Sequence, residues 1–238
     1  MAETAKALYN RWAESGSLRP SLLLTEKSED MLRLLQDALY DRLIDEVPEI
    51  KKTETLHATT FYLRPAELFK YMKRNVNPKI TQERFYPHLM SPTSMLLLYN
   101  ERSRVHITGI ERFKSDESTI GVALHHEEFE DAAMNTRQWI QHALKQFGAN
   151  QSTYDDMAQI PQFEWLVKDS TPHITLVENV DPSIPIPLLY PPTAAWFDGV
   201  DAGTATASPT NRQDLFWWHL RGLPGDPMLE RRNKKEDA

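Results

Sequence analysis

Residues 172–176 read PHITL and residues 56–60 read LHATT, so both stretches contain the pattern His-x-Thr. Each stretch is rich in β-branched residues, which predicts a β-strand. Because side chains alternate between the two faces of a strand, the histidine and the threonine of one stretch lie on the same face. We therefore expect two strands that each present one imidazole and one hydroxyl to a common site.

The polar residues of these stretches are the candidate catalytic residues, namely His57, Thr59, His173 and Thr175. A neutral imidazole can take a proton from an attacking water or hydroxyl, and a protonated imidazole can give one to the leaving oxygen of a phosphodiester. The threonine hydroxyls would donate to the non-bridging phosphate oxygens. This chemistry requires no metal and no other cofactor, and we expect none.

The two stretches resemble the motifs of the 2H phosphoesterase superfamily, which is named for two H-x-[ST]-x motifs on strands of a two-lobed α+β fold. PHITL is the closer match, whereas polar Thr60 follows the first motif where an apolar residue is usual. The resemblance implies an α+β fold with antiparallel sheets around a central cleft. It also implies a metal-independent phosphodiesterase that acts on cyclic nucleotides, 2′-5′-linked oligoadenylates, cyclic oligonucleotides or RNA ends.

Two alternatives to this hydrolase stay open. The first is a module of the same fold that binds a nucleotide but catalyses no reaction. Two histidines favour the enzyme, because binding a phosphate does not need two groups that exchange protons. The second is an RNA end ligase, which should need a positively lined track for two RNA strands. Outside the basic residues 231–235, the sequence offers no such stretch.

Other histidines have simpler interpretations. A third His-x-Thr tripeptide begins at His106, within a predicted strand that leads to Phe113, and we expect a structural role for it. Residues 125–128 read HHEE and have the side chains of a metal site. A strand end followed by the acidic first turn of a helix explains them without a metal.

The remaining pattern predicts an alternation of strands and helices. The expected strands cover residues 18–24, 55–63, 95–99, 105–113, 119–124 and 172–180. The apolar stripe Leu32, Leu35, Leu39 and Leu43 predicts an amphipathic helix capped by Ser28. A short helix is expected to begin at Pro65, and one long helix is expected over residues 127–148, followed by a loop at residues 149–169.

Composition limits the class of protein further. The chain has 238 residues, a formal net charge of −7 and no cysteine, which excludes disulfides, thiolate metal sites and a cysteine nucleophile. It contains no run of about 18 apolar residues, so no membrane span is predicted. Its first residues lack the apolar core of a secretory signal, which makes a cytoplasmic site the default. The acidic balance favours a small anionic ligand over long nucleic acid.

The predicted organisation is one catalytic domain followed by an extension. Residues 1–180 are expected to form the 2H phosphoesterase-like domain, with residues 1–17 as a short lead. Half of the sixteen prolines follow residue 181, so residues 181–238 are expected to be a mostly irregular extension with a strand at residues 215–220. A nucleotide, cyclic oligonucleotide or RNA end is the expected partner, and the oligomeric state is not predicted.

Overall fold

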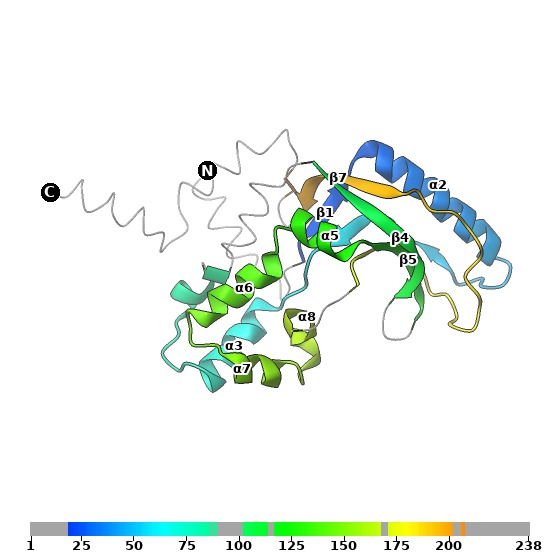
Figure 1. Cartoon of the computed structure of the whole chain (residues 1–238). Coiled ribbons are helices and arrows are strands. Elements are labelled where there is room, and N and C mark those ends of the chain that lie inside the picture. The colour runs from blue at the N-terminus through cyan, green and yellow to red at the C-terminus, as the bar shows by residue number, and fades with distance from the viewer. Residues whose placement is uncertain are drawn as a thin grey trace.

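The strands of the chain pair into one antiparallel sheet in the computed structural model (Figure 1), which describes residues 19–86, 88–89, 102–113, 117–167, 171–201 and 206–207. The strands are β1 (Ser21–Leu24), β2 (Lys51–Lys52), β3 (His57–Thr59), β4 (Ser103–Phe113), β5 (Thr119–Leu124), β6 (His173–Glu178), β7 (Ala194–Asp201) and β8 (Thr206–Ala207). Their order is β1-β3-β6-β5-β4-β7, and β7 pairs again with β1, so six strands close into a barrel-like ring. The predicted α+β class with antiparallel strands is confirmed, but the described strands form one continuous sheet where separate sheets were expected.

The helices lie on two sides of this sheet. They are α2 (Glu26–Leu43), α3 (Pro65–Asn75), α5 (His126–Ala132), α6 (Thr136–Lys145), α7 (Gln151–Met157), the short 3-10 helix η1 (Pro161–Phe163) and α8 (Glu164–Val167). Helix α2 packs along β1, β2, β6 and β7, while α3, α6, α7 and α8 gather in a group away from α2 (Figure 1). The sheet therefore lies between α2 and this helical group (Figure 1).

Helix α2 is built as its sequence predicts, except at its first turn. The leucines of the predicted stripe are all buried, and they face the sheet. The N-cap is Thr25, whose Oγ1 accepts a hydrogen bond from the backbone N–H of Ser28 at 3.4 Å. Ser28 lies inside the helix, where its hydroxyl accepts from the backbone N–H of Trp196 at 2.9 Å. The N-cap is therefore three residues before the predicted one, because the hydroxyl of Thr25, and not that of Ser28, reaches the free N–H groups of the first turn.

The predicted long helix at residues 127–148 is wrong, since two helices occupy this stretch. Met134 and Asn135 adopt left-handed backbone conformations, with φ of 54° and 48°, and they separate α5 from α6. The loop expected at residues 149–169 is also wrong, because it contains α7, η1 and α8. Helix α7 begins with a capping box in which Asn150 and Thr153 bind each other's backbone N–H. Helices of seven and four residues are too short to show a clear apolar period.

Two strand expectations also change. The strand expected over residues 55–63 is shorter, since β3 covers His57–Thr59 and, of the rest, Leu63 alone forms an isolated bridge. The stretch after residue 181 was expected to be mostly irregular, but it contains β7, which pairs with both β1 and β4 and belongs to the ring. The strands expected at residues 95–99 and 215–220 lie outside the described residues. Among the helices of the described residues, none has the length and apolar character that crossing a membrane requires.

Candidate active site

The two His-x-Thr motifs lie side by side on β3 and β6. Ala58 is directly opposite Ile174 in this antiparallel pair, and both side chains are completely buried in the core. The residues before and after them face the opposite side of the sheet. Each histidine therefore comes next to the threonine of the other motif. The structure thus brings together all four predicted residues, His57, Thr59, His173 and Thr175.

These four residues line one pocket with a volume of about 310 Å³. The rest of its lining comes from Arg19, Thr53, Thr55, Thr60, Phe61, Tyr62, Glu130, Arg137, Trp165, Thr171, Pro172 and Glu178. The wall includes several hydroxyl groups and two guanidinium groups, which are the donors that bind phosphate oxygens. Carboxylates of Glu130 and Glu178 are also present, so the pocket is polar without being uniformly positive.

The two histidine rings are held in the same way. Nδ1 of His57 lies 3.1 Å from the carbonyl oxygen of Thr55, and Nδ1 of His173 lies 2.9 Å from that of Thr171. A carbonyl oxygen can only accept, so Nδ1 is the donor in both contacts and carries a proton. With Nδ1 as the donor, Nε2 is the candidate nitrogen for proton exchange with a ligand. The repeated unit is thus Thr-x-His-x-Thr, and the sequence contains this signal at residues 55–59 and 171–175.

The surroundings of the two rings differ. Burial lowers the pKa of His57 below its ordinary value of 6.5, and the charge of Arg19 lowers it further, while the Thr55 contact and Asp201 act in the opposite direction. His57 is therefore neutral near pH 7, as a general base must be. The ring of His173 stacks on that of Phe113, with centroids 4.1 Å apart and planes 8° apart.

One wall of the pocket comes from a residue that the sequence did not single out. Trp165 of α8 stacks on Phe61, with ring centroids 5.2 Å apart. In the part of the chain that the structure describes, Trp165 Nε1 and Thr53 Oγ1 are buried without a hydrogen-bond partner. Buried polar groups are usually paired, so these two atoms of the pocket wall are exceptions to that rule. Trp165 was missed because α8 falls in the stretch that was predicted to be a loop.

The third His-x-Thr tripeptide contributes nothing to this pocket. His106 lies on β4 and is not among the lining residues. Its Nδ1 and its backbone N–H both contact the carboxylate of Glu128, each at 2.6 Å. The backbone hydrogen bond and then the His106 side chain lower the pKa of Glu128. Among the residues that the structure describes, no three His, Asp or Glu side chains group together as metal ligands would, and this includes residues 125–128.

The chain matches known proteins by structure and not by sequence. No protein-family model matches the chain, and no curated protein matches its sequence. The chain aligns with the crystal structure of TT0787 of Thermus thermophilus at 18% identity, over 77% of this chain and 85% of that one, with a TM-score of 0.46. It aligns with Escherichia coli LigT complexed with 3′-AMP at 12% identity, over 78% and 85% of the two chains, with a TM-score of 0.44. With apo LigT the identity is 12%, the coverage is 80% and 91%, and the TM-score is 0.43.

Proposed function

We propose that this protein is a phosphodiesterase of the 2H type that works without a metal. The proposed substrates are cyclic or 2′-5′-linked nucleotides, or RNA ends. The pocket lined by His57, Thr59, His173 and Thr175 on β3 and β6 is the proposed active site. One observation carries the proposal. Two histidines on neighbouring strands line one pocket, and each has Nδ1 bound to a backbone carbonyl.

In the proposed mechanism His57 is the general base and His173 the general acid. Nε2 of neutral His57 takes a proton from water, whose oxygen then forms a bond to phosphorus. The bond from phosphorus to the ester oxygen breaks, and that oxygen receives the Nε2 proton of His173. The hydroxyls of Thr59 and Thr175 donate to the non-bridging oxygens, where charge grows in the transition state. Each proton-transfer group in such a reaction contributes about 10²- to 10⁴-fold in rate.

A substrate panel tests the proposal. The full chain is treated with EDTA and incubated with 2′,3′-cyclic nucleotides, 2′-5′-linked oligoadenylates, cyclic oligonucleotides and RNA with a cyclic phosphate end. We expect at least one of them to be cleaved, at a rate that EDTA leaves unchanged, with products read by mass spectrometry. Activity that EDTA abolishes and a divalent cation restores would contradict the mechanism, because the metal would then supply the nucleophile. Binding without product would identify a nucleotide-binding module.

The pH dependence of kcat/KM is a second test. We expect a bell-shaped profile, because one histidine must be neutral and the other protonated. The base is inactivated as the pH falls through its pKa, and the pKa of His57 is lowered, so the acid limb should lie below pH 6.5. Along that limb the rate should fall about tenfold per pH unit. The two limbs describe a coupled pair of groups, so single variants are needed to assign them. An acid limb above pH 7 would contradict the role given to His57.

A further inference from the structure

The carbonyl groups that orient the two histidines are supported by different parts of the fold. Next to Thr171, the carbonyl of Pro172 accepts a hydrogen bond from Leu124 at 2.9 Å, so β5 holds this end of the second motif. In the first motif, residues 53–56 between β2 and β3 belong to no strand, and a backbone hydrogen bond from the N–H of Thr53 to the carbonyl of Leu176, at 3.0 Å, links this segment to β6. The carbonyl of Thr55, which accepts from His57, lies within this segment.

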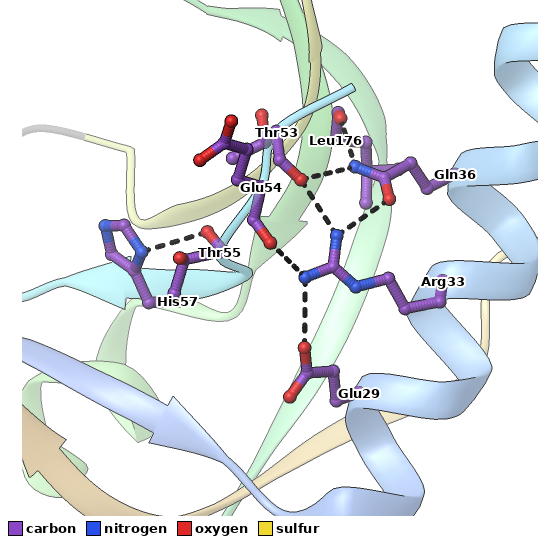
Figure 2. A network of polar contacts seen from close by, with 8 residues as sticks. All are labelled: Glu29, Arg33, Gln36, Thr53, Glu54, Thr55, His57 and Leu176. Carbon is purple, nitrogen blue, oxygen red and sulfur yellow. Dashed lines mark hydrogen bonds and ion pairs between the residues drawn. The ribbon is translucent and has the colours of Figure 1, made fainter.

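Side chains of α2 bind this segment (Figure 2). Arg33 donates from Nη1 to the carbonyl of Thr53 at 2.8 Å and from Nη2 to the carbonyl of Glu54. Gln36 donates from Nε2 to the same Thr53 carbonyl at 3.0 Å and to the carbonyl of Leu176 on β6 at 2.7 Å. Two side chains of one helix thus fix two successive carbonyls just before Thr55, and they tie this segment to the strand that carries His173.

Arg33 is itself held in place. Its Nη2 forms an ion pair with Glu29 Oε1 at 3.0 Å, and its Nη1 donates to Gln36 Oε1 at 2.9 Å. Gln36 is 1% exposed, whereas the side chains of Arg33 and Glu29 are 30% and 43% exposed, so the network is shielded from water at Gln36 and open to it at Glu29. A guanidinium group is planar and offers several donors in a fixed geometry. It can therefore bind two neighbouring carbonyls at once, which the single ammonium group of a lysine cannot do in the same geometry.

We propose that Arg33 is a positioning residue for His57. By fixing the carbonyls of Thr53 and Glu54, Arg33 holds the carbonyl of Thr55 where it accepts the Nδ1 proton of His57. The hydrogen bond at one ring nitrogen decides which tautomer a histidine adopts. Without Arg33 the Thr55 carbonyl moves, and the ring takes up both tautomers and further orientations. The effect on turnover rests on the proposed function, whereas the tautomer is a property of the free protein.

The test compares two arginines of α2. Arg33→Met removes the donors, and Arg42→Met is the matched control, since Arg42 donates to the carbonyl of Leu188, away from the pocket, at 3.2 Å. The full chain is labelled with ¹⁵N-histidine and its tautomers are read by NMR without substrate. We expect His57 to be protonated at Nδ1 in the wild type and in Arg42→Met, and to be a mixture of tautomers in Arg33→Met. His173 should stay unchanged in all three and serves as the internal reference.

Kinetics on the best substrate of the panel provide a second readout. Arg33→Met should lower kcat about tenfold and change KM less than about twofold, because the reacting group is misoriented while the pocket is retained. The proposal is overturned if the tautomer of His57 is unchanged in Arg33→Met, or if His57 and His173 change together. If Arg33→Met does not fold, Arg33→Lys keeps the charge and the stem, and the same NMR result decides. A wild type without turnover would refute the proposed function, and the NMR comparison would still decide the role of Arg33.

Discussion

Replacing either histidine of the pocket with alanine is expected to lower turnover by about 10²-fold or more. His57→Ala removes the group that accepts the proton of water, and His173→Ala removes the group that protonates the leaving oxygen. Both rings line the pocket and are only partly buried, so both variants should fold. The measurement is kcat/KM on the best substrate of the panel, with the melting temperature recorded for each variant.

His106→Ala is the matched control for this pair. It removes the histidine of the same tripeptide from β4, where the imidazole contacts Glu128 and lies outside the pocket. Its turnover should stay within about tenfold of the wild type. A loss as large as that of His57→Ala, in a folded protein, would show that the reaction uses a different pair of strands.

A substrate with an activated leaving group separates the two roles. Such a leaving group departs without a proton, so the general acid becomes dispensable. His173→Ala should therefore recover most of its rate on this substrate, while His57→Ala should not. Recovery by His57→Ala alone would reverse the assignment, and recovery by neither would show that protonation of the leaving group is not the function of either ring.

The sequence predicted the candidate site better than it predicted the surrounding helices. The alternation of β3 and β6 was enough to place each histidine with its threonine on one face, because a strand has a fixed period of two. Pairing of the two strands with each other depended on the resemblance of the motifs. Arg33 and Trp165 could not be found this way, since their contacts with the site cross between distant parts of the chain.

The errors in the predicted fold have a common origin, since each depends on a feature that the local sequence pattern does not report. The break between α5 and α6 depends on two residues in left-handed conformation, and Met134 is not a residue that signals such a break. Strand β7 was missed because prolines dominate the composition around it, although its own sequence, AAWFDGVD, contains none. Its pairing with β1 and β4 is a tertiary interaction, which a local pattern does not report.

Gly121→Ala is expected to destabilise the protein by about 3 kcal/mol, at the upper end of the usual cost of overpacking. Gly121 is buried on β5, and the sheet register is irregular between Ile120 and Gly121. A Cβ atom there would lie 2.3 Å from the carbonyl oxygen of Ile174 and 3.1 Å from the Cα of Thr175. Because both are backbone atoms, no side-chain rotation can relieve the collision, and β6 must move away from β5. That movement displaces Thr175 and the neighbouring His173, so kcat/KM should fall as well.

Gly109→Ala shows whether the close approach of β5 to β6 is the cause. Gly109 lies on β4, opposite β5, and the nearest atom to its added Cβ would be Glu111 Oε1 at 3.9 Å, an ordinary contact. This variant should change the free energy of unfolding by less than about 0.5 kcal/mol, since it only removes a flexible residue from a strand. Denaturant unfolding and kcat/KM of both variants are compared with the wild type. Equal stability and equal turnover of the two variants would mean that the position of β6 does not depend on the missing side chain at Gly121.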